Sequence, residues 1–157
     1  MFGRLEDLVN RGVNLKKANL LFFVFTDNYD LQNVIIDLNT NEQLYEGRDA
    51  TGELLENIGG EYATLTVSYK KIVGAPYDRV TLKDSGGLYK SFNVKAKEKE
   101  FEIIADYEKI DDDGEKSDLR DRWGDNLAGL TKESRVVLVK ALLPYLREYI
   151  INYLLND

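Results

Sequence analysis

The residues from Thr131 to about Leu155 carry the strongest secondary-structure signal in the chain. Apolar side chains recur there at helical spacing, and Thr131 is a typical helix N-cap. One stripe comprises Val139, Leu142, Leu143, Leu146, Ile150, Tyr153 and Leu154, and a second comprises Val137, Leu138, Ala141, Tyr145, Tyr149 and Ile151. Pro144 lies inside the run and removes the hydrogen bond to the carbonyl of Lys140, so the helix should bend. A helix that is apolar on more than one face requires more than one packing partner.

A small antiparallel sheet is predicted in the middle of the chain. Residues 91–97 and 100–106 each alternate apolar and polar side chains, and the two residues between them form the turn of a hairpin with one buried face. The lysines of the first strand lie opposite glutamates of the second. We therefore expect solvated cross-strand ion pairs here and not a phosphate-binding stripe.

Helices are predicted before this hairpin. Residues 4–11 form a short helix, and residues 14–25 are either a second helix or a buried strand. A further helix, capped by Asp27 or Asn28, should run to about Leu44. Its apolar stripe comprises Leu31, Val34, Ile35 and Leu38.

The remaining segments complete the expected fold. Residues 47–60 should be a loop because several glycines interrupt them. Residues 64–73 form a short helix capped by Thr64 and ended by Gly74, with a strand as the alternative. The sequence thus predicts one α+β domain over residues 1–157, with N-terminal helices, a small antiparallel sheet and a long bent C-terminal helix packing across it.

The acidic charge is concentrated in one segment. The formal net charge is −7, and residues 98–125 hold twelve acidic and five basic side chains. Their centre, residues 110–117, includes Asp111, Asp112 and Asp113 and has no apolar period, so we expect an exposed, mobile acidic loop. A negative overall charge also disfavours tight binding of DNA.

The composition excludes most enzyme templates. The chain has no Cys and no His, so its residues supply no thiolate nucleophile, no Ser–His triad and no imidazole metal ligand. We expect no metal, no cofactor and no enzymatic activity. The run Asp84-Ser85-Gly86 does match the Asp-Thr/Ser-Gly signature of aspartic proteases, whose retroviral members take one carboxylate from each of two subunits. Those proteases are almost entirely β, and the simpler interpretation is that Asp84 caps a short helical turn and Gly86 allows close approach.

Large apolar side chains are expected in the core and at subunit contacts. Trp123, followed by Gly124, should anchor a loop in the core. The run from Leu20 to Phe25 is too short to span a bilayer, so we expect no membrane contact. The first seven residues carry acids where a signal peptide requires a basic start, so we expect no export. The interface candidates are Leu138, Leu142, Tyr145, Tyr149, Tyr153, Phe22 and Phe25.

Several segments together resemble a family of phage structural proteins. They are Gln43-Leu44-Tyr45-Glu46-Gly47, Tyr62-Ala63-Thr64-Leu65-Thr66, Lys70, Gly74, the run from Arg79 to Phe92 that contains Asp84-Ser85-Gly86, and Gly129-Leu130-Thr131. In this order they are similar to the tail-completion, or virion-morphogenesis, family of tailed phages and prophages of gut Bacteroidetes, including the neck ring proteins of crAss-like phages. The resemblance covers about residues 40–140.

The resemblance implies a virion protein of the head–tail neck, made in the cytoplasm of the bacterial host. Copies would form a ring that contacts portal or adaptor and tail proteins, and DNA would pass through it without sequence-specific binding. Residues 111–113 would then face the lumen and repel the DNA. Two other classes stay open, namely a retroviral-type aspartic protease using Asp84 and a small soluble phage-encoded adaptor.

Overall fold

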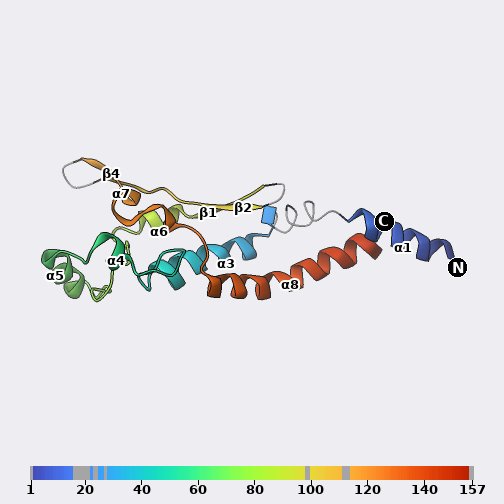
Figure 1. Cartoon of the computed structure of the whole chain (residues 1–157), viewed down its shortest axis with the longest axis horizontal. Helices are drawn as coiled ribbons and strands as arrows, with labels where there is room; N and C mark the ends of the chain where they lie inside the picture. The colour runs from blue at the N-terminus through green and yellow to red at the C-terminus, as the bar shows by residue number, and fades with distance from the viewer. Residues whose placement is uncertain are drawn as a thin grey trace.

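The computed structural model describes residues 2–15, 22, 25–26, 28–97, 100–110 and 114–155. The molecule is elongated, and Figure 1 shows α1 (Phe2–Asn14) and the end of α8 (Lys132–Leu155) at one end and α5 (Thr64–Ile72) at the other. The other elements are α3 (Tyr29–Asn39), a π-helical turn η1 (Thr40–Leu44), α4 (Leu55–Gly59), α6 (Gly87–Ser91), β1 (Asn93–Ala96), β2 (Phe101–Ile104), β3 (Glu108–Ile110), β4 (Lys116–Asp118), α7 (Leu119–Trp123) and a 3-10 turn η2 (Asp125–Leu127). Helices combined with two small antiparallel sheets confirm the α+β class.

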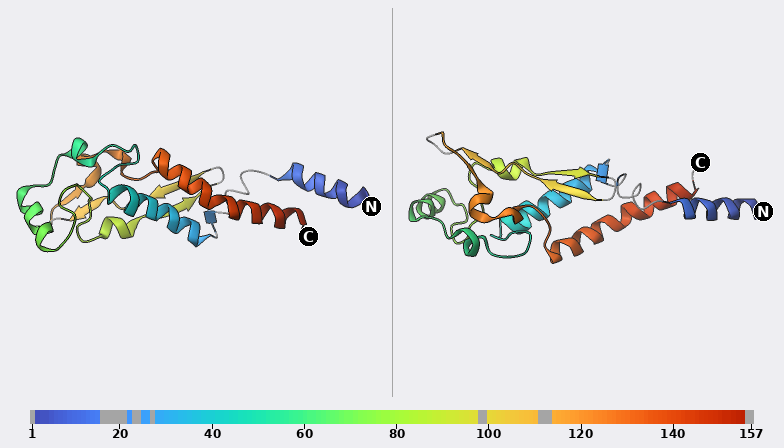
Figure 2. Two further views of the ribbon diagram at one scale, coloured as in Figure 1. Left: turned by 90° about the horizontal axis from the view of Figure 1, so that it is seen from below. Right: turned by 45° about the horizontal axis from the view of Figure 1, so that its top comes forward.

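Helix α3 is the central layer of the fold. It contacts β1 and α8, and Figures 1 and 2 show the β1–β2 hairpin on one side of it and α8 on another. Leu31 and Ile35 of α3 are fully buried, and Val34 and Ile36 add apolar surface beside them. We expected α8 to pack across the sheet, but its main neighbours are α3 and α1. The reason is that α3 is apolar on more than one side and therefore lies between the other two layers.

Two adjoining clusters of buried side chains form the core. The first contains Phe25, Leu31, Ile35, Leu38, Val94, Leu130 and Leu138. The second contains Leu44, Leu55, Val80, Leu88, Phe92 and Leu127. Ile36 and Ile103 pack against both clusters and make the apolar interior continuous.

The helix predictions are largely confirmed. Asn28 caps α3, since its side-chain oxygen accepts a hydrogen bond from the backbone N–H of Leu31 at 3.0 Å. The helix becomes a π-helical turn at Thr40, a change that the sequence pattern did not indicate. Residues 64–72 are helical and not extended, and Gly74 follows them with φ +69°. The predicted cap was wrong, because Thr64 is the first helical residue and Ala63 occupies the cap position. Most of residues 14–25 lie outside the described part of the chain.

Hairpin β1–β2 has the predicted register. Val94 pairs with Ile103 and places one apolar face on the core. On the exposed face the Lys97 ammonium lies 2.9 Å from Glu102, and this ion pair raises the pKa of Lys97 and lowers that of Glu102. The expected cross-strand ion pairing is therefore present.

Two segments expected to be loops contain regular structure. Helix α4 and a backbone bridge between Arg48 and Leu54 lie within residues 47–60. Strands β3 and β4 lie on either side of residues 111–113 in the sequence and pair with each other, so the mobile-loop prediction is wrong for these flanks. Both strands are short and nearly all exposed, and they consequently lack the apolar alternation that reveals a strand in sequence. Asp111, Asp112 and Asp113 lie outside the described residues.

Helix α8 runs without interruption through Pro144, and Figure 1 shows its axis changing direction partway along. The change of direction agrees with the bend expected from a proline inside a helix. Among the helices that the structure describes, none combines the length and apolar character of a membrane span.

Candidate functional site

Helix α8 has one covered face and one open face. Ser134 and Leu138 are buried against the core, and the partly buried Ala141, Leu142 and Tyr145 continue the covered face. The opposite face carries Val136, Val139, Leu143 and Ile151, each between 43% and 57% exposed. We call these four side chains the outer face of α8. Because apolar residues surround the helix, packing on α3 covers only part of them.

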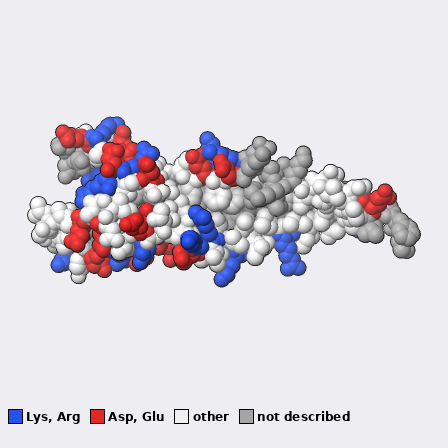
Figure 3. Space-filling model, in the orientation of Figure 1, with Lys and Arg blue, Asp and Glu red and all other residues white. Residues whose placement is uncertain are grey.

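A shallow groove crosses the outer face of α8. It has a volume of about 510 Å³ and is lined by Lys140, Leu143, Pro144, Arg147, Glu148 and Ile151. Its apolar floor and charged edges resemble the core and rim of a protein–protein contact. In Figure 3 the end that holds α8 and α1 is mostly uncharged, whereas acidic and basic side chains are interspersed over the rest of this view.

Helix α1 lies at the same end and is incompletely covered. It contacts α8, as Figure 2 shows, but Val9 and Val13 are 57% and 80% exposed. An ion pair of 3.0 Å between Asp7 and Arg11, one turn apart, lies on the polar side of the helix. The part of the apolar face of α1 that holds Val9 and Val13 is therefore left largely uncovered.

A third apolar surface lies on α5 at the far end of the molecule. Leu65, Tyr69 and Ile72 recur at helical spacing and are 85%, 60% and 84% exposed. Tyr77 lies beside them, with the Lys71 ammonium 4.7 Å from its ring centroid. We call Leu65, Tyr69 and Ile72 the α5 stripe. Its one-turn spacing was a signal for this surface that our sequence reasoning missed.

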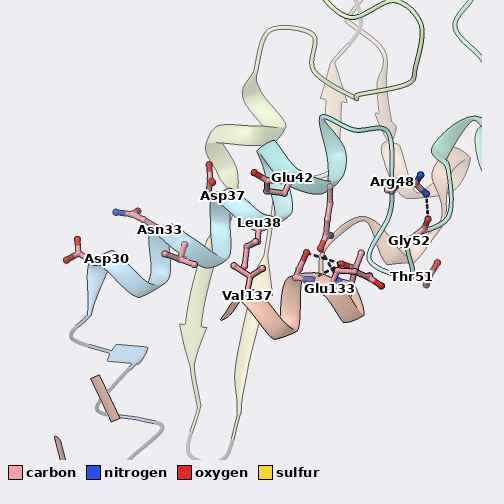
Figure 4. A pocket seen from close by; sticks show the side chains of 14 residues that line it. Asp30, Asn33, Asp37, Leu38, Glu42, Arg48, Thr51, Gly52, Glu133 and Val137 are labelled. Atoms are coloured by element: carbon pink, nitrogen blue, oxygen red, sulfur yellow. Dashed lines mark hydrogen bonds between the residues drawn. The ribbon is translucent and has the colours of Figure 1, made fainter. Parts of the chain in front are cut away.

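An acidic groove separates α3 from the start of α8. Figure 4 shows Leu38 of α3 and Val137 of α8 pointing toward one another, with Asp30, Asp37, Glu42 and Glu133 around them. The groove has a volume of about 1100 Å³. The guanidinium of Arg48 at its edge donates a hydrogen bond to the carbonyl of Gly52 at 2.8 Å.

The predicted interface residues divide between core and surface. Phe25 and Leu138 belong to the buried cluster, so they support the fold and do not lie on the surface. Leu142 and Tyr145 are partly buried against the same cluster. Phe22 is 49% exposed. The rings of Tyr149 and Tyr153 stack on each other, with their centroids 6.2 Å apart. The candidates that the sequence pattern selected on α8 therefore lie mostly on its inner face.

The Asp-Ser-Gly motif forms an exposed turn before α6. Asp84 is exposed and does not cap the helix, contrary to our interpretation. Gly86 takes the cap position with φ +83°, and a Cβ there would meet nothing within 4 Å, so its role is backbone conformation and not close approach. Beside this turn, the buried Lys70 ammonium donates to the carbonyl of Lys83 at 2.9 Å and lies over the ring of Tyr62.

Trp123 is the core anchor that the sequence predicted. It ends α7, packs against the second core cluster and contacts the backbone of Gly59 closely. The Arg122 guanidinium lies 4.5 Å from the ring centroid. The indole N–H is buried and has no hydrogen-bond partner among the described residues.

Two bases of the described acidic segment are paired with its acids. Lys116 pairs with Glu108 at 2.8 Å across strands β3 and β4. Arg120 pairs with Asp118, and this contact lowers the pKa of Asp118 to about 2. No group of three Asp or Glu side chains within the described residues is arranged to hold a metal ion.

Comparison with known protein families, curated proteins and solved structures finds no match for the chain.

Proposed function

We propose that this protein is a structural subunit of the head–tail neck of a tailed phage, where copies assemble into a ring through which DNA passes. The observation that carries the proposal is the outer face of α8. It presents four exposed apolar side chains on a helix that is apolar all round, and such a helix is normally covered on both sides. A neighbouring subunit is the simplest cover for this face.

The distribution of apolar surface favours a ring over an isolated pair. The outer face of α8 and the α5 stripe lie on different elements at opposite ends of an elongated molecule. A contact that joins unlike surfaces of successive copies generates a closed ring when the rotation permits it. The remaining stripe is then available to the proteins above and below, which we propose are portal or adaptor and tail proteins.

The charge of the chain supports passage of DNA without tight binding. The net charge is −7, and two bases of the described acidic segment, Lys116 and Arg120, are already paired with acids. The phosphates of DNA would find few unpaired basic side chains on such a surface. We keep Asp111, Asp112 and Asp113 as candidates for the lumen.

The fold argues against the protease alternative. A retroviral-type aspartic protease would be almost all β, whereas this chain ends in the 24-residue helix α8. A small soluble adaptor is the remaining alternative, and it would be monomeric and missing from purified virions.

The test is the assembly state of the whole chain and its presence in particles. Light scattering coupled to size-exclusion chromatography, followed by electron microscopy, should detect closed rings of one defined copy number. Mass spectrometry of purified virions should find the protein at a ring-like copy number. A chain that stays monomeric at high micromolar concentration and is missing from virions would remove the proposal.

A further inference from the structure

We infer that the outer face of α8 is covered by helix α1 of a second copy of the chain, so that each subunit extends an N-terminal arm onto its neighbour. This inference rests on the proposed self-assembly and names the contact that makes it. Three observations carry it, namely the incomplete burial of α1, its fit to α8 in length and its fit in charge.

Helix α1 requires more packing than its own chain supplies. It has 13 residues, and an isolated helix of that length is marginal in water. Its contact with α8 leaves Val9 and Val13 largely exposed. A helix in this position gains stability only when another apolar surface covers those side chains.

Helix α1 is long enough to lie along the outer face of α8, and its exposed side chains have a matching spacing. Helix α1 is about 20 Å long, and the stripe from Val136 to Ile151 on α8 extends about 22 Å along its axis, at 1.5 Å per residue. Val9 and Val13 are one turn apart, as are Val139 and Leu143 on α8. Helices with such rows of medium-sized side chains pack by fitting the ridges of one into the grooves of the other.

The charges beside the two faces are complementary. Glu6 is exposed and lies on the same side of α1 as Val9 and Val13, given 100° of rotation per residue. Lys140 and Arg147 are exposed and line the groove on α8, with Glu148 at its edge. Docking α1 along this groove would place an acid of one copy beside two bases of the next. Such pairing sets orientation more than affinity.

The chain allows a direct test because it has no cysteine. Val13→Cys in one preparation is mixed with Val136→Cys, Leu143→Cys or Ile151→Cys in another, and the mixture is oxidised. A disulfide requires the two Cβ atoms to approach within about 4.5 Å. Asn14→Cys is the matched control, since it lies next to Val13 in sequence but is turned about 100° away from it around the axis of α1.

We expect a covalent dimer with at least one α8 position, at a yield at least fivefold above that of the Asn14 control. A double variant that carries the reactive pair in one chain should then give a ladder of covalent oligomers. A disulfide formed only within single chains would show that α1 covers its own α8, and would overturn the inference. If no cysteine pair cross-links above the level of the control while light scattering still detects rings, the inference about α1 is also overturned, and the proposed function stands. A monomeric wild-type chain would remove both.

Discussion

The indole ring of Trp123 packs directly on the backbone of Gly59. A Cβ added at Gly59 would lie 2.5 Å from Cδ1 and 2.6 Å from Nε1 of Trp123, closer than side chains approach. The contact joins α4 to α7 at the edge of the second core cluster. Glycine is required here for space, since its φ is not in the left-handed region.

Gly59→Ala should therefore destabilise the fold. The methyl group displaces the indole or the backbone, and overpacking of this kind costs about 2 kcal/mol. Urea unfolding followed by Trp123 fluorescence measures the change. Gly12→Ala is the control, because a Cβ there meets nothing within 4 Å and alanine favours the helix. Equal stability of the two variants would contradict the packing argument.

The side chain of Gln43 joins η1 to the residues just before α8, and its loss should be costly. Its amide donates to the carbonyl of Gly129 at 2.9 Å and accepts from the N–H of Thr131 at 2.9 Å. Gln43→Ala leaves both backbone groups without partners in a buried place, which costs about 3 kcal/mol. Thermal unfolding should show the loss. Asn41→Ala removes only an exposed hydrogen bond and should change stability by less than about 0.5 kcal/mol.

Tyr89 should make the stability fall at alkaline pH. Burial, together with the neighbouring Tyr62 and Tyr45, raises the pKa of its hydroxyl, which donates to the carbonyl of Thr81 at 2.7 Å. A group whose pKa is raised by folding contributes full stability below its ordinary pKa of 10.0 and loses it as the pH rises above that value.

Unfolding curves of Tyr89→Phe at pH 8 to 11 check this dependence. The variant should be less stable than wild type at pH 8, because the hydrogen bond is lost, and the difference should shrink above pH 10. Tyr77→Phe, at a half-exposed position, serves as the control and should run parallel to wild type. A constant difference for Tyr89→Phe across the range would refute the assignment.

Replacing Pro144 should stabilise the subunit but weaken its assembly. Pro144→Ala restores a backbone N–H that can donate to the carbonyl of Lys140, so α8 should straighten and gain about 1–3 kcal/mol. The parts of the outer face before and after residue 144 would then lie at a different angle to each other. Light scattering should therefore show weaker assembly. Lys132→Ala, in the first turn of α8 and outside the groove, leaves the helix axis unchanged and should assemble more strongly than Pro144→Ala. Unchanged assembly of Pro144→Ala would mean that the bend is not needed.

Features that depend on neighbouring residues were predictable from the sequence. The cap at Asn28, the helix over residues 64–72 and the register of β1 with β2 all follow from side chains within a few positions of one another. Strands β3 and β4 were missed for the converse reason. They are held by pairing with each other, and their exposed side chains carry no periodic apolar signal.

The sequence by itself determined that residues 132–155 form a helix with apolar side chains on every side. Only the tertiary structure decided that Leu138 and Tyr145 face the core while Val139, Leu143 and Ile151 face outward. The physical reason is that periodicity records which side chains share a face of one helix. Which face is covered depends on α3, whose residues are distant in sequence and meet α8 only when the chain folds.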